Sequence, residues 1–381
     1  MTYQSRRHFV GQISLALAAI GCRAQITSDK DRALPPTPAQ LATIEALATR
    51  FMGKYNVPGM SHSVAVLGQL VYERAFGVAD KSAHEQLTPS HLFRIASVSK
   101  PITSVAIFQM IELGLLKTSD LIFGPAGIFK EDFGETAKHP YLEELRLEHL
   151  LTHTGGGWQN DDKDPMFANP QMNHKELISW TIANQPLTNR PGTHFAYSNF
   201  GYCLVGRVIE KLSQKSYADH VKSEVLSRCG VTDMRISGNT LSDRAPREVV
   251  YYGQSENPYD MNVSRMDSHG GWLATASDLV RFATHVDGFA TTPNILRPET
   301  IAAMTTATDA EKGYAHGWAV NRVGNWWHSG SLPGTTSIMV RTKSGLCWAA
   351  LTNTRSLGSA MNGDLDRMMW EIVQSVPEWR A

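Results

Sequence analysis

RIASVSKPITSVAIFQMIELG, residues 94–114, places a lysine in a segment whose apolar residues fall on every side of a helix. Because Pro101 lacks the backbone donor that a helix interior needs, the helix must begin within the preceding turn, near Ser97. Gly114 is a suitable residue to end it. A helix that is apolar all round is buried, so this segment predicts a central helix around which the fold is built.

The spacing of Ser97 and Lys100 predicts chemistry at the start of this helix. Residues three apart lie on one helix face, so the lysine amine can reach the serine hydroxyl. Burial disfavours the ammonium form, lowers the lysine pKa and makes the amine a base. The serine then becomes an activated nucleophile, and backbone N–H groups at a helix N-terminus suit an oxyanion.

Composition excludes several classes of function. The chain has 381 residues, 42% of them hydrophobic, and its 36 Lys and Arg balance 36 Asp and Glu. A globular protein without basic excess is expected to bind a small molecule or a peptide, and no nucleic acid. No phosphate-binding glycine loop or paired Cys-x-x-Cys is present, so we expect no cofactor and no metal. We interpret Asp161, Asp162 and Asp164 as a solvated loop, because they lack calcium-loop spacing.

The first residues have the layout of an export signal. Residues 1–25 carry two arginines, then a short apolar run and small residues, and 26–37 reads as a linker. Arg6 and Arg7 fit a twin-arginine pattern, and Cys22 follows a degenerate lipoprotein site as the residue to be acylated. We therefore predict a periplasmic or extracellular protein with a bacterial-type signal, and leave Tat against Sec export and the lipid anchor open.

Strand patterns lie at both ends of the chain with helical patterns between them. We predict a helix over 38–55, a hairpin over 60–80 turning near Gly68, and a last helix over 363–376. This order predicts an α/β (α+β) fold, with an antiparallel sheet from 38–114 and 265–381, flanked by helices, and an inserted helical subdomain over 115–264. Helical patterns cover 147–153, 174–185, 201–212, 216–229 and 270–286, and strand patterns cover 316–322, 325–330, 335–342 and 346–353.

Cysteines of an exported chain can pair. If the helical segments before and after residue 214 fold back as a hairpin, Cys203 meets Cys229. The sequence leaves open a disulfide between them and two buried thiols.

Further stretches support the serine chemistry by resemblance. Tyr197-Ser198-Asn199 precedes a helical pattern, and His328-Ser329-Gly330 lies in a strand pattern. Together with Ser97-x-x-Lys100, and with LLTHTGG at 150–156 and GGWLATASDLVRF at 270–282, they resemble the motifs of the serine β-lactamase and penicillin-binding-protein superfamily. Their order is that of its class C β-lactamase-like branch, which includes family VIII esterases and D-aminopeptidase-like hydrolases. The resemblance covers about residues 38–376.

The resemblance implies a role for each matching residue. Ser97 would be the acylated nucleophile, Lys100 its proton acceptor, and Tyr197 a proton relay to the leaving group. Asn199 would hold the substrate's amide or carbonyl, and the backbone N–H groups of Ser97 and Ser331 would form the oxyanion hole. We interpret His153 in LLTHTGG as a residue that organises its loop.

One motif departs from much of the family. Where Lys-Thr-Gly is common, this chain has His328, Ser329 and Gly330, as some esterases and D-aminopeptidases of the branch do. A histidine is mostly neutral at pH 7, so the charge that holds a substrate carboxylate is weakened. We expect an esterase or D-peptidase and not an efficient β-lactamase. The alternatives are a penicillin sensor acylated without turnover, and a true β-lactamase or D-Ala carboxypeptidase.

Overall fold

The strands predicted at the two ends of the chain meet in one antiparallel sheet. The computed structural model describes residues 34–134, 139–358 and 360–379. The predicted export segment 1–25, Cys22 and most of the linker 26–37 therefore lie outside the described residues. The sheet contains, from edge to edge, β3 (Glu85–Gln86), β2 (Gln69–Asp80), β1 (Gly59–Val66), β10 (Leu346–Thr352), β9 (Thr335–Arg341), β8 (Trp326–Leu332) and β7 (Ala319–Val320).

Every neighbouring pair in this sheet is antiparallel, and β1 lies directly beside β10. The predicted α/β fold, with a sheet made from N- and C-terminal segments and flanked by helices, is confirmed. The hairpin from β1 to β2 turns at Leu67 and Gly68, both with positive φ (45° and 81°). Such a turn matches the twist of the strands that it joins.

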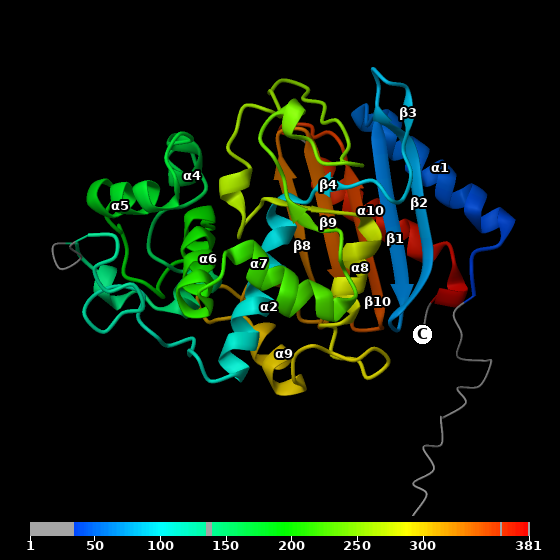
Figure 1. Cartoon of the computed structure of the whole chain (residues 1–381). Helices are drawn as coiled ribbons and strands as arrows, with labels where there is room; N and C mark the ends of the chain where they lie inside the picture. The colour runs from blue at the N-terminus through cyan, green and yellow to red at the C-terminus, as the bar shows by residue number, and fades with distance from the viewer. Residues whose placement is uncertain (1–33, 135–138, 359, 380–381) are drawn as a thin grey trace, which may run out of the picture. The chain divides into compact units, whose positions relative to one another are not determined.

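Helices cover both faces of the sheet (Figure 1). The first face carries α1 (Pro38–Tyr55) and α10 (Met361–Gln374), and the second carries α2 (Ser99–Glu112) and α8 (Ala276–Thr284). Side chains alternate along β1, so that Val64 and Val66 join the core under α1 and α10 while Ala65 joins the core around α2. Because both faces are covered, the central strands β1, β9 and β10 are buried along their whole length.

The first helix has the bounds that the sequence predicts. Thr37 and Gln40 form a capping box at its start, and Asn56, with φ of 50°, ends it. Its last residue, Tyr55, donates from its hydroxyl to Asp364 Oδ2 of α10 across 2.6 Å. The two ends of the described chain are therefore tied together on one face of the sheet.

The predicted central helix is confirmed, with one difference at its start. Residues from Ser99 to Met110 of α2 are all buried, and Gly114 follows its end with φ of 72°. Ser97 itself lies in a 3-10 turn, Ala96–Val98, which leads into the α-helix. Directly upstream, β4 (Phe93–Arg94) pairs with β6 (Trp272–Ala274) in a second sheet completed by β5 (Arg235–Ile236).

The segment 115–264 supplies mainly helices and loops, and Figure 1 shows α6 beside α2, with α4 and α5 on the far side of α6. Its division from the rest of the chain as a subdomain stays a prediction. Its helices are α3 (Leu147–Leu151), α4 (Pro165–Ala168), α5 (His174–Asn184), α6 (Asn199–Ser213) and α7 (Tyr217–Val221), the last continued by a π turn Lys222–Leu226 and a 3-10 turn Ser227–Cys229. After α8, the chain adds α9 (Pro298–Met304). Further 3-10 turns are Leu142–Glu144, Leu241–Asp243, Ser264–Met266 and Pro377–Trp379.

Two smaller points complete the fold. Cys203 in α6 and Cys229 are both buried and free, so the structure has the two thiols and not the disulfide. Within the described ranges, no helix combines the length and the apolar character needed to cross a membrane.

Candidate active site

Ser97 follows a strained turn. Ala96 is fully buried and has φ of 47°, a conformation uncommon for a residue with a side chain. The segment is held by the backbone N–H of Ile95, which donates to Trp272 O of β6 across 3.0 Å. Ser97 is partly exposed, whereas Ile95, Ala96 and Val98 are buried. Strain of this kind is concentrated at functional sites, and here it brings one hydroxyl to the surface of the core.

Lys100 is fully buried and has three polar neighbours. Its Nζ lies 3.2 Å from Ser97 Oγ, 2.8 Å from Asn199 Oδ1 and 3.0 Å from His269 O. Burial lowers the pKa of Lys100 to about 7, although the negative charge of Asp164 acts in the opposite direction. The amine is therefore partly neutral near pH 7, as a general base must be.

The geometry around Lys100 decides where its lone pair points. Asn199 Oδ1 and His269 O can only accept hydrogen bonds, so they take both hydrogens of a neutral amine. The lone pair is then left for Ser97 Oγ, which donates its proton to it. After the transfer, the ammonium has three hydrogens for three acceptors. Both protonation states of the lysine are therefore satisfied without any movement of the side chain.

Tyr197 contacts both members of this pair. Its hydroxyl hydrogen-bonds with Ser97, and burial raises its pKa, so the phenol keeps its proton at neutral pH. Its ring centroid lies 4.7 Å from Lys100 Nζ. A lysine and a protonated phenol therefore stand beside the same serine oxygen, which is the arrangement needed for a proton relay.

Asn199 lies at the start of α6 and is engaged on both ends of its amide. Oδ1 accepts from Lys100, and Nδ2 donates to Asp164 Oδ2 across 2.9 Å. Nδ2 has a second hydrogen and Asn199 lines the pocket, so its contact with a substrate carbonyl stays a prediction. Asp164 is fully buried, so its interpretation as part of a solvated loop is wrong, whereas Asp161 and Asp162 are exposed.

His328 belongs to a chain of hydrogen bonds behind Tyr197. Ser198 N–H donates to His153 Nδ1 across 3.1 Å, so the neutral His153 carries its proton on Nε2 and donates to the Tyr314 hydroxyl, also across 3.1 Å. At the other end, His328 Nδ1 donates to Ser329 O across 2.7 Å, so its Nε2 accepts from Tyr314 across 3.0 Å. With the donor fixed at one end and the acceptor at the other, the Tyr314 hydroxyl accepts from His153 and donates to His328.

Both histidines of this chain are neutral. Burial, and after it the charge of Lys100, lower the pKa of His328 to about 3. The pKa of His153 is lowered well below its usual range for the same two causes. The His153 ring also packs on Tyr197, with centroids 4.1 Å apart, which fits its predicted role in organising the loop. The motif His328-Ser329-Gly330 therefore contributes a polar ring without a positive charge to the site.

Gly330 lets β8 approach the turn Ala96–Val98, which carries Ser97 and is called the nucleophile turn below. A Cβ at Gly330 would lie 2.4 Å from Ile95 O and 3.0 Å from Ala96 Cβ, so only glycine fits there. Next to it, Ser331 lines the same pocket as Ser97. The predicted oxyanion hole needs the backbone of these two serines on one side of a substrate carbonyl, and the close approach of β8 permits it.

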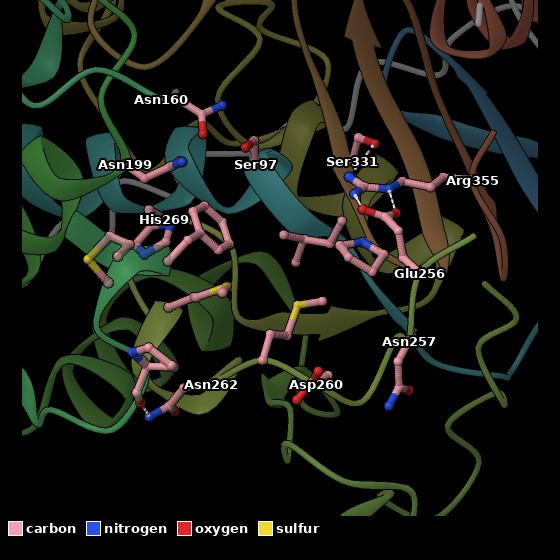
Figure 2. A pocket seen from close by; sticks show the side chains of 18 residues that line it. Ser97, Asn160, Asn199, Glu256, Asn257, Asp260, Asn262, His269, Ser331 and Arg355 are labelled. Carbon is pink, nitrogen blue, oxygen red and sulfur yellow. Dashed lines mark hydrogen bonds and ion pairs between the residues drawn. The ribbon is translucent and has the colours of Figure 1, made fainter. Parts of the chain in front are cut away.

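The pocket in front of Ser97 has a volume of about 490 Å³. Figure 2 shows Ser97, Asn160 and Asn199 at one side of it, and Ser331 beside Arg355 at another. Arg355 forms a bidentate ion pair with Glu256, with Nε 2.6 Å from Oε2. The remaining walls are mixed: apolar Met166, Phe167, Pro170, Met261, Met266, Leu332 and Pro333, and polar Asn257, Asp260, Asn262 and His269.

Sequence reasoning assigned no role to several residues of this site. The sequence patterns wrongly place Asp164 in a solvated loop. They give no sign that Tyr314, His269 and Arg355 belong to the site. Asp164 precedes a proline, which is a signal for a helix N-cap that could have separated it from its two exposed neighbours. Over the described part of the chain, no group of three or more His, Cys, Asp or Glu side chains could hold a metal ion.

Comparisons with known proteins identify the family of this chain. The family model described as Beta-lactamase matches residues 44–368. Penicillin-binding protein 4* of Bacillus subtilis (strain 168) is 26% identical over 310 residues, which are 72% of this chain and only 63% of that protein's length. Penicillin-binding protein 4 of Amycolatopsis lactamdurans is 25% identical over 328 residues, with 79% of this chain and 82% of the relative covered.

Solved structures share the fold at lower identity. The D-amino acid amidase of Ochrobactrum anthropi SV3, complexed with L-phenylalanine amide, superposes with a TM-score of 0.73 at 21% identity, covering 90% of this chain and 100% of the amidase. A β-lactamase/D-alanine carboxypeptidase of Pseudomonas syringae gives a TM-score of 0.73 at 18% identity, covering 88% and 99%. Since the family model spans most of the chain and the fold agrees, this protein belongs to the β-lactamase family of the serine β-lactamase and penicillin-binding-protein superfamily.

Proposed function

We propose that this protein is an exported serine hydrolase that forms an acyl-enzyme on Ser97 and cleaves ester or amide bonds, including those of D-amino-acid peptides. The observation that carries the proposal is the environment of Lys100. Two pure acceptors occupy the hydrogens of the neutral amine, and its lone pair faces Ser97 Oγ at 3.2 Å. Export rests on the sequence of residues 1–25 alone.

The reaction follows from the positions of these groups. Lys100 takes the proton of Ser97 as Oγ bonds to the substrate's carbonyl carbon, and the oxyanion is stabilised by backbone N–H groups of Ser97 and Ser331. The proton then passes from the ammonium through Tyr197 to the leaving alcohol or amine as the bond to it breaks. Water attacks the acyl-enzyme in the same way, giving the free acid and restoring the Ser97 hydroxyl.

The charges in the pocket favour substrates without a carboxylate anchor. His328 is neutral, and the guanidinium of Arg355 is paired with Glu256. A substrate carboxylate would therefore have to compete with an internal carboxylate for its partner. Short-chain esters and D-amino-acid amides need no such anchor, and we place them ahead of β-lactams as substrates.

The test is a panel of p-nitrophenyl esters, D-amino-acid amides and nitrocefin, assayed with the wild type and Ser97→Ala. We expect turnover of at least one ester or amide by the wild type and none by Ser97→Ala. Activity that survives in Ser97→Ala on every substrate would contradict the assignment of the nucleophile. The exposed Ser82→Ala serves as the matched control and should keep full activity.

A second measurement separates an enzyme from a sensor. A fluorescent penicillin and a fluorophosphonate are followed on the wild type by gel and by mass spectrometry of the Ser97 peptide. Loss of the penicilloyl group within minutes, together with ester turnover, supports hydrolysis. A penicilloyl group that stays for hours without any ester turnover would replace the proposal with a protein that senses penicillins.

A further inference from the structure

Asp164 is a buried carboxylate at a place where no reacting atom touches it. It lies at the N-cap of α4 with no exposed surface, and the reaction proposed above does not use it. We propose that Asp164 is a positioning residue, which fixes the orientation of the Asn199 amide and thereby directs the lone pair of Lys100 at Ser97. This inference rests on the proposed function and assigns a further residue to the same site.

The first step of the argument concerns the orientation of the amide. The two ends of an Asn side chain have nearly the same shape, so packing alone does not decide which end faces Lys100. Asp164 decides it. One of its oxygens accepts from Met166 N across 2.9 Å, and the other accepts from Asn199 Nδ2 across 2.9 Å. An ionised carboxylate can only accept, so Nδ2 must face Asp164 and Oδ1 must face Lys100.

The second step is what the reverse orientation would do. With Nδ2 toward Lys100, the amide would offer a hydrogen to the lone pair of the neutral amine. That lone pair would then be drawn from Ser97 Oγ toward Asn199, and the base would lose its target. The ammonium formed after proton transfer would face N–H groups at the 2.8 Å position where an acceptor now lies. Both states that the reaction needs would be destabilised.

The third step is the charge that Asp164 brings. Lys100 is faced by this carboxylate from the α4 loop, and by the rings of His153, His269 and His328, which burial keeps neutral. Asp164 raises the pKa of Lys100 against the effect of burial.

Asp164 itself is faced by Lys100, Asp161 and Arg265. Burial raises its pKa to about 6, so it is mostly ionised at neutral pH. Its charge therefore keeps the lysine basic enough to take a proton from serine.

The test uses Asp164→Asn in the full-length protein. An asparagine still caps α4, but it can present its own N–H to Asn199 and removes the charge. We expect the second-order rate of Ser97 labelling by a fluorophosphonate to fall about 10- to 100-fold, as for a reacting group that is misaligned. The acid limb of the rate against pH should also shift to lower pH, because the group that raises the pKa of Lys100 is gone. Asp162→Asn, an exposed carboxylate in the same loop, is the matched control and should behave like the wild type.

A double-mutant cycle with Asn199→Ala separates positioning from a general loss of stability. The cycle is run at pH 9, where the Lys100 amine is neutral with or without the nearby charge. If Asp164 acts through Asn199, adding Asp164→Asn to Asn199→Ala should change the labelling rate there by less than about 2-fold. Asp164→Ser keeps a capping oxygen but no charge, so its labelling rate should fall as it does in Asp164→Asn. A second variant with the same loss shows that the effect does not come from misfolding of one variant. Equal labelling of wild type and Asp164→Asn, or independent effects in the double variant, would overturn the inference. Failure of the wild type to be labelled at Ser97 would instead overturn the proposed function.

Discussion

The Tyr314 hydroxyl donates to Nε2 of His328 across 3.0 Å, and this contact holds the His328 ring in one tautomer. The same hydroxyl accepts from His153, so a single phenol joins the strand β8 to the loop before α6. All three side chains are buried. The walls of the site are therefore positioned relative to one another by a chain of neutral groups.

Tyr314→Phe should lower the free energy of unfolding by about 1–3 kcal/mol, since two buried ring nitrogens lose their partner at once. Urea denaturation followed by fluorescence measures it. Tyr141→Phe, at a side chain that is 40% exposed, is the matched control and should change stability by less than about 0.5 kcal/mol. Equal stability of both variants would contradict the orientation of protons assigned to the chain.

Acylation of Ser97 should depend on pH through Lys100. The amine acts only when neutral, and its pKa is about 7, so the rate should rise with pH across this value and become level above it. Lys100→Met should lower the rate about 10²- to 10⁴-fold and remove this dependence. Fluorophosphonate labelling between pH 5 and 9 measures both, with the exposed Lys163→Met as control. A full rate in Lys100→Met would show that another base acts.

Glu256→Gln should change substrate preference. The guanidinium of Arg355 is paired with the carboxylate of Glu256. Without this carboxylate, Arg355 is an unpaired cation at the pocket wall. We expect kcat/KM for an acyl donor with a carboxylate to rise about 3- to 10-fold relative to its neutral analogue, as befits a partly exposed ion pair. The gain should shrink at 1 M salt, where charges are screened. An unchanged ratio would mean that Arg355 does not reach the substrate.

Gly330→Ala should reduce activity strongly. The new methyl would meet Ile95 O at 2.4 Å, so β8 must move away from the nucleophile turn. A displacement of this size should lower kcat about 100-fold in the ester assay. Gly363→Ala in α10 is the matched control, because nothing lies within 4 Å of its Cβ and alanine should stabilise the helix by up to about 1 kcal/mol. Full activity of Gly330→Ala would rule out a tight approach of β8.

The sequence predicts the main helices and strands of this protein where the pattern of apolar residues is strong. The apolar run through α2 and the apolar and β-branched run in β1 reflect burial, which the fold must respect wherever these segments lie. The helical pattern predicted over 270–286 is wrong at its start, because 272–274 form β6 and α8 begins at Ala276. Strands as short as β4, β5 and β6 could not be predicted, because two or three residues carry no periodicity. They pair only because tertiary packing brings them beside the nucleophile turn.

Some residues of the candidate site could be predicted from the sequence and others could not. Ser97, Lys100 and Tyr197 stand in recognisable motifs, and the structure brings them into contact. Tyr314 and Asp164 lie outside these motifs, and their partners are 14 and 35 residues away in the chain. Hydrogen bonds between residues so far apart depend on the folded chain, which local patterns do not describe.

The pairing of β1 with β10 joins two segments that are made far apart in time. Residues 59–66 leave the ribosome long before their partner in the sheet, 346–352. Until these emerge from the ribosome, β1 has no partner on that side, and the strand bearing Gly330 has no sheet to hold it against Ser97. A chain cut before residue 346 therefore carries the serine and the lysine without the strand that completes the sheet beside β1.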